Sequence, residues 1–95
     1  MKLSDVATIK TNYPDADFWL VRRGSLKTVG LPSYEFNSES IGIKVTRTDL
    51  VLSRYLYYCL LNLHSSGRWE PLATGSLSLV NIKVSDVRNI ALIPR

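Results

Sequence analysis

The segment 54–66 is the one stretch of this chain whose apolar residues recur with the period of an α-helix. Ser53 precedes it as a helix N-cap, and Gly67 follows it as a helix stop. One face of this helix must pack on other elements, because most helical stability in proteins comes from burying an apolar face. The expected core stripe consists of Leu52, Leu56, Cys59, Leu60 and Leu63.

The remainder of the chain has the pattern of short strands separated by loops. β-branched and aromatic residues gather in runs at 7–10, 18–23, 26–29, 41–47, 80–82 and 91–93. Proline, glycine, asparagine and serine mark the loops at 11–15, 31–40 and 74–76. We therefore predict one α+β domain over residues 1–95, with a small, irregular, mostly antiparallel sheet, one principal helix at about 54–66 and short helical turns.

Composition excludes several classes of protein. A chain of 95 residues can bury one core but not two, and 45% hydrophobic with 21% charged residues excludes a disordered chain. The longest apolar run, residues 55–61, is far shorter than the roughly 20 residues of a membrane span. The amino terminus lacks the apolar stretch of a secretory signal. We expect a cytoplasmic protein with no membrane partner.

The sequence offers little for catalysis. With one cysteine and one histidine, it has neither an internal disulfide nor the Cys and His ligands of a structural zinc site. His64 falls on the flank of the last helical turn, Cys59 falls on the core stripe, and Asp15 with Asp17 has the pattern of loop chemistry. No base stands beside a nucleophile in this pattern, so we expect no enzyme activity, no metal and no cofactor.

Positive charge is concentrated in the middle of the chain. Twelve Lys and Arg residues against eight Asp and Glu residues give a net charge of +4. Most of the charged residues in the middle half of the chain are basic, and a fold that gathers them would present one basic face to nucleic acid. The central basic residues are Arg22, Arg23, Lys27, Lys44, Arg47, Arg54 and Arg68.

Several segments, in order and together spanning almost the whole chain, are similar to one protein family. The opening 2–11 has a leucine, a small residue, an acid and an apolar residue, and 22–25 has a basic residue before Gly-Ser. A Tyr-Leu pair begins the helix in 52–60. Further matching segments are 73–76, 81–90 and 93–94. Together they resemble the target recognition domain of type I restriction-modification DNA specificity subunits, of which this chain holds a single copy.

This resemblance implies a DNA-binding module that reads a half-site without catalysis. Such a domain lays its loops against the major groove of double-stranded DNA while basic side chains and hydroxyls hold phosphates. Tyr34, Asn37 and Ser38 in the loop 31–40 could contact base edges. The expected DNA-binding residues are Arg22, Arg23, Ser25, Lys27, Lys44, Arg47, Arg68 and Ser76.

An alternative is a protein–protein interaction module that keeps this fold without reading DNA. Tyr57, Tyr58 and Leu61 fall on the side of the helix opposite the expected core stripe, and aromatic residues there are typical of an interface. The partners would be methyltransferase or restriction subunits of a restriction-modification complex, or a second copy. Under the DNA-binding hypothesis, the chain would be a free-standing or mobile-element-borne version of the recognition domain.

Overall fold

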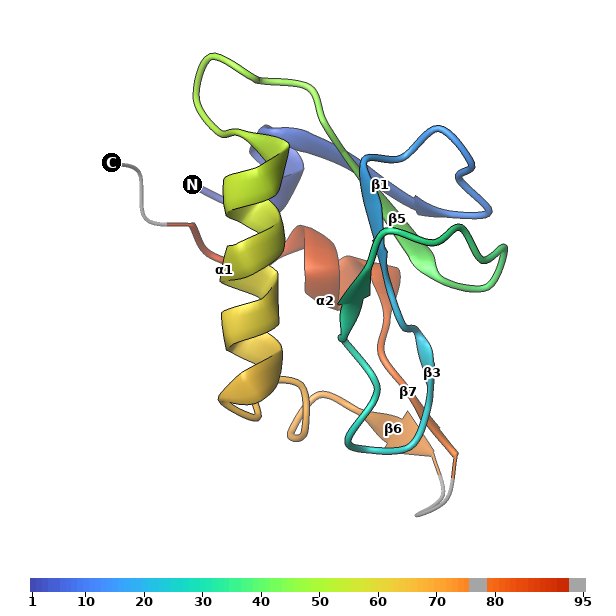
Figure 1. Ribbon diagram of the computed structural model, residues 1–95. Helices are drawn as coiled ribbons and strands as arrows, with labels where there is room; N and C mark the ends of the chain where they lie inside the picture. The colour runs from blue at the N-terminus through green and yellow to red at the C-terminus, as the bar shows by residue number, and fades with distance from the viewer. Residues whose placement is uncertain (76–78, 93–95) are drawn as a thin grey trace.

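The computed structural model describes residues 1–75 and 79–92, and Figure 1 shows their arrangement. It confirms the α+β prediction, with a mostly antiparallel sheet arrangement, one main helix and shorter helical elements. In chain order the elements are η1 (Leu3–Asp5), β1 (Ala7–Thr11), β2 (Phe18–Leu20), β3 (Arg23–Gly24), β4 (Pro32–Ser33), β5 (Ile41–Val45), α1 (Ser53–Ser65), β6 (Thr74–Gly75), β7 (Val80–Asn81) and α2 (Val84–Arg88).

The strands form two small sheets along the long axis of the molecule. The first has the order β1-β5-β2-β4, and the second has the order β3-β7-β6. β2 runs through residues 21 and 22 directly into β3, so one stretch of chain connects the two sheets. In Figure 1 the second sheet lies below the first, beside the carboxyl end of α1.

The core lies on one face of the first sheet. β1 alternates buried and exposed residues, and its register pairs Ile9 with Ile43 and Ala7 with Val45 of β5. A half-buried antiparallel strand has this period of two. Leu56 and Leu60 of α1 are buried in the same apolar cluster. The cluster also contains Leu3, Val6, Phe18, Leu20, Val29, Ile41, Trp69, Val80, Ile82 and Val87.

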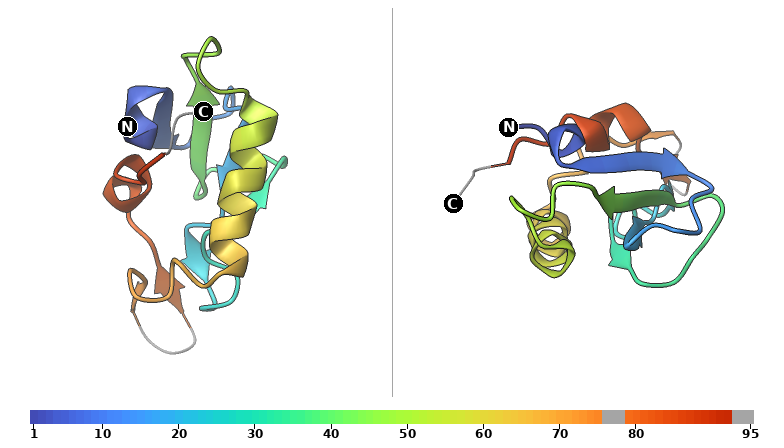
Figure 2. Two further views of the ribbon diagram at one scale, coloured as in Figure 1. Left: turned by 90° about the vertical axis from the view of Figure 1, so that its left-hand side faces the viewer. Right: turned by 90° about the horizontal axis from the view of Figure 1, so that it is seen from above.

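The two helices lie on different sides of the sheet, as Figure 2 shows. α2 borders the outer edge of β1, where Arg88 Nη2 donates to the carbonyl oxygen of Ile9 at 2.8 Å. This bond occupies a carbonyl that the edge strand would otherwise leave open to another strand. At the carboxyl end of β5, the Val45 N–H donates to Asp17 Oδ2 at 2.8 Å. The loop after β1 is thereby fixed to the sheet.

Gly42 lets that loop cross the outer face of β5. A Cβ atom on Gly42 would lie 2.7 Å from Cβ of Tyr13 and 3.0 Å from Cβ of Ala16. Trp19, opposite Gly42 on β2, donates its indole N–H to the Tyr13 carbonyl at 2.9 Å. The outer face of the first sheet is therefore partly covered by the chain's own loop.

Several details of the predicted elements were wrong. The predicted loops 31–40 and 74–76 contain the short strands β4 and β6. The run 26–29 is a turn rather than a strand, because Ser25, Thr28 and Gly30 close it by hydrogen bonds. The helix begins at Ser53, so Leu52 occupies the N-cap position and is 66% exposed instead of lying on the core stripe. The closing strand is reduced to one bridge between Lys2 and Ala91. Ile93 lies outside the described residues.

Candidate nucleic-acid interface

The turn after β3 is closed by its own backbone hydrogen bonds and exposes Leu26 and Lys27. The Ser25 carbonyl accepts from the N–H groups of Thr28 and Val29, at 3.0 and 3.1 Å. Ser25 Oγ and Thr28 Oγ1 lie 3.1 Å apart in a further hydrogen bond. Val29 is fully buried and anchors the turn, whereas Leu26 and Lys27 are exposed.

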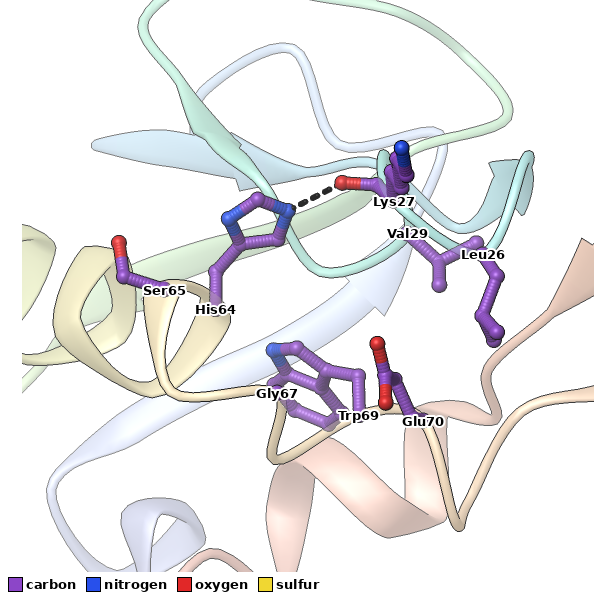
Figure 3. Close-up of a pocket in the computed structure, with 8 residues that line it drawn as sticks. All are labelled: Leu26, Lys27, Val29, His64, Ser65, Gly67, Trp69 and Glu70. Atoms are coloured by element: carbon purple, nitrogen blue, oxygen red, sulfur yellow. Dashed lines mark hydrogen bonds between the residues drawn. The ribbon is translucent and has the colours of Figure 1, made fainter.

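The same turn is held against the end of α1, as Figure 3 shows. His64 Nε2 donates to the carbonyl oxygen of Lys27 at 2.6 Å, and since a carbonyl only accepts, the proton is on Nε2. Two contacts from different segments thus fix the turn. The second is the indole of Trp69, which packs directly on Gly30. Gly30 has φ +81°, so neither its backbone nor the indole leaves room for a side chain.

An open cavity of about 370 Å³ lies between the turn and the segment after α1. Leu26, Val29 and Trp69 supply its apolar walls, while Lys27 and Glu70 supply opposite charges. Trp69 Nε1 is buried and has no hydrogen-bond partner among the described residues. The carboxylate of Glu70 places negative charge beside the basic residues of this region.

Three of the predicted DNA-binding cations come from the segments around this cavity. Arg23, Lys27 and Arg68 are exposed, and within the described part of the chain their side chains make no hydrogen bond or ion pair. Arg23 comes from β3, Lys27 from the turn, and Arg68 from the segment after α1. Exposed cations without an internal partner are the groups best able to bind phosphate oxygens. We call Arg23, Lys27 and Arg68 the basic cluster.

The other predicted cations lie elsewhere or have partners. Arg22 donates through Nε to the Glu39 carbonyl at 3.0 Å, and Lys44 donates through Nζ to the Asp15 carbonyl at 3.2 Å. Arg47 forms a two-bond ion pair with Asp49, at 3.0 and 3.1 Å. The hydrogen bond from Arg47 lowers the pKa of the Asp49 carboxyl, and the same bond raises the pKa of the guanidinium.

The predicted set is therefore not gathered on one face. Lys44 lies near Asp17, which directly precedes β2, and Arg23 is six positions further along the chain, about 20 Å for extended backbone. Ser25 accompanies the basic cluster, although its hydroxyl is already bonded to Thr28. Ser76 lies outside the described residues.

The loop before β5 uses its polar side chains locally. Asn37 Oδ1 accepts from the Glu39 N–H at 2.9 Å, a bond typical of a tight Asx turn. Tyr34 is exposed and stacks on Tyr57, with ring centroids 4.2 Å apart. Ser38 is exposed, and its carbonyl accepts from the Asn12 N–H. Of the three residues expected to contact base edges, Asn37 thus already uses its side-chain oxygen in a hydrogen bond within the loop.

The three residues of the expected protein interface on α1 differ in their exposure. Tyr57 is half-buried: its ring lies edge-on to Phe18 at 5.4 Å, and its hydroxyl donates to the Pro32 carbonyl at 3.2 Å. It therefore packs at the margin of the core rather than on a free surface, because β4 and its flanking loop cover this side of the helix. Tyr58 is 61% exposed, and Leu61 is half-buried.

Sequence reasoning missed an apolar groove on the other side of α1. It has a volume of about 470 Å³ and lies between the helix, Met1 and the segment 90–92. Leu52 and Cys59, both expected in the core, line it. The exposed apolar neighbours Leu50 and Leu52 before the helix are the features of the sequence that could have indicated it.

Among residues 1–75 and 79–92, no group of three or more His, Cys, Asp or Glu side chains is placed to hold a metal ion. No helix in those ranges is long and apolar enough to cross a membrane. Comparison of the chain with protein-family models, curated proteins and solved structures finds no match.

Proposed function

We propose that this chain is a DNA-binding module that reads a short site without catalysing a reaction, in the manner of a single target recognition domain of a type I restriction-modification specificity subunit. The basic cluster is the observation that carries this proposal. Its three cations come from three segments of the chain, project into solvent and have no internal partner among the described residues. A surface built in this way suits a phosphate backbone.

The backbone of the turn supports the same role. The N–H groups of Leu26 and Lys27 face away from the bonds that close the turn and donate to no acceptor in the described chain. Exposed N–H groups beside cations commonly contribute to phosphate binding in protein–DNA complexes. The His64 and Trp69 contacts hold this turn rigidly, so little ordering is required on binding.

An interaction module that does not read DNA is the second candidate. Glu70 favours it, because this carboxylate lies in the cavity beside Lys27 and lowers the positive potential there. In that case the partner would be a subunit of a restriction-modification complex. We propose that either function is carried out in the cytoplasm.

Fluorescence anisotropy with a randomised duplex pool tests the proposal. The footprint of one small module is limited, so we expect weak binding whose affinity falls steeply with salt. Sequencing of the bound DNA should show enrichment of a motif of a few base pairs. Absence of binding at low salt would reject the proposal and favour the protein partner.

A further inference from the structure

DNA binding leaves the apolar groove along α1 unexplained. Leu56 and Leu60 form its floor, and Ile90 and Leu92 form the wall opposite the helix. Leu50 and Leu52 lie at its rim, 54% and 66% exposed. Figure 2 (left) shows α1, the amino terminus and the carboxyl-terminal segment together on one side of the molecule.

The chemistry of the lining restricts the occupant. Among the described residues that line the groove, none carries a charged side chain, and Asn62 is the most polar. A charged side chain would therefore lose its hydration there without gaining an ion pair with a lining side chain. An uncharged, branched apolar side chain is the complementary group. Leu50 and Leu52 offer such side chains beside the groove itself.

The size of the patch also fits association. Met1, Leu50, Leu52 and Tyr55 are each between 41% and 66% exposed. Together they present on the order of 400 Å² of mostly apolar surface, within the range of the largest patches found on monomers. Two such patches, with the half-buried groove walls, reach the roughly 1,000 Å² of total buried surface that a specific interface needs.

We propose that this groove is the contact surface of a homodimer, in which Leu50 and Leu52 of each copy enter the groove of the other. The projecting side chains of Leu50 and Leu52 lie next to the groove on one face. A single two-fold axis can therefore place the leucines of each copy in the groove of the other. The contact is apolar and modest in area, which corresponds to a dissociation constant in the micromolar range. This proposal is independent of DNA binding.

Sedimentation equilibrium of the whole chain without DNA, from low to several hundred micromolar, tests the dimer. We expect a monomer–dimer equilibrium in the wild-type protein. Leu52→Asp and Leu50→Asp should each raise the dissociation constant at least about tenfold. Both positions are exposed, so far-ultraviolet circular dichroism should show an unchanged fold.

Two matched controls locate the contact. Leu72→Asp changes an apolar residue that is 44% exposed outside the groove, and Tyr58→Asp changes the opposite side of α1. Leu72→Asp should alter the dissociation constant by no more than about twofold, and Tyr58→Asp, at an exposed position of α1 that does not line the groove, should alter it far less than Leu52→Asp does. The Cys59 thiol lines the groove, so its reaction with a maleimide should slow as the wild-type concentration rises and stay constant in Leu52→Asp.

Three results would overturn the proposal. They are a monomer at every concentration, open-ended growth beyond a dimer, and a dimer that Tyr58→Asp dissociates while Leu52→Asp does not.

Discussion

At the scale of single residues, the contact between Gly30 and Trp69 positions part of the candidate interface. The indole packs on the glycine backbone and thereby holds the turn that carries Lys27. Neither residue has a charge or an active group, and their partnership joins positions 39 residues apart in sequence. Sequence patterning therefore identified Gly30 only as a break after an apolar run.

Gly30→Ala should destabilise the protein by about 2–4 kcal/mol, because a Cβ there both occupies a left-handed backbone conformation and collides with the indole. Gly67→Ala is the matched control. Gly67 has a similar φ of +75°, but the nearest atom to its added Cβ lies 3.7 Å away. Its cost should be only the backbone term of about 1 kcal/mol. Urea unfolding measures both; equal losses would show that the Trp69 contact is not tight.

Asp49 should titrate below its ordinary carboxyl pKa of 3.8, because Arg47 donates two hydrogen bonds to its charged form. A carboxyl pKa that is lower in the folded state adds stability above the unfolded pKa and loses it as the pH falls through the folded pKa. Both side chains are exposed, so the contribution is small and screened by salt. Carbon-detected NMR titration should show the Asp49 midpoint rising in Arg47→Gln; an unchanged midpoint would contradict the pair.

At the scale of elements, α1 shows what periodicity can and cannot predict. The apolar repeat correctly placed the helix and its buried residues Leu56 and Leu60. It could not distinguish a core position from a groove position, because both demand an apolar side chain. Leu52 and Cys59 therefore appeared as core residues, although they line an open surface. Tyr57 was expected on an open side of the helix, but it is half-buried there. The strand that covers it, β4, has only two residues and was not visible in the sequence pattern.

The short strands were the hardest elements to predict. β3, β4, β6 and β7 have two residues each, too few for a period to be visible. Their pairings join distant positions, such as Arg23 with Asn81. Only the longer strands β1 and β5 could be predicted from alternation. The sequence thus identified the fold class and strands of both sheets, but neither β4 and β6, which fall in segments predicted as loops, nor the pairing of the strands into two sheets.

Leu52→Asp should stabilise the monomer by about 1 kcal/mol, because Leu52 occupies the N-cap of α1 and makes no capping hydrogen bond there. The aspartate oxygen can accept from an N–H of the first helical turn. Its negative charge also interacts favourably with the positive amino-terminal end of the helix dipole. Thermal unfolding at a concentration too low for association isolates this effect. Leu52→Ala is the control, since alanine cannot cap. A melting temperature no higher than that of Leu52→Ala would contradict the assignment of the cap.

At the scale of the whole molecule, charge and apolar surface occupy different places. The basic cluster lies where the second sheet meets the carboxyl end of α1, and the groove extends along α1 to the amino terminus and residues 90–92. With a longest extent of 40 Å, the molecule is large enough for both surfaces to be used together. Lys10, Lys44 and Arg54 provide charge elsewhere, near the first sheet and the start of α1.

The measurement that tests the central claim most directly is the salt dependence of DNA affinity in two matched triple variants. One replaces Arg23, Lys27 and Arg68 by glutamine, and the other replaces Lys10, Lys44 and Arg54. Each variant loses three positive charges, so any difference between them reflects position rather than net charge. Each lost phosphate contact should reduce the slope of log affinity against log salt by about 0.9.

For the basic-cluster variant we predict that this slope becomes shallower by about 2 to 3 and that binding nearly disappears at moderate salt. The control variant should keep a slope within about 0.5 of the wild-type value. Equal loss in both variants would show that only overall charge attracts DNA and would contradict a built interface. A wild-type slope retained by the basic-cluster variant would contradict the account altogether.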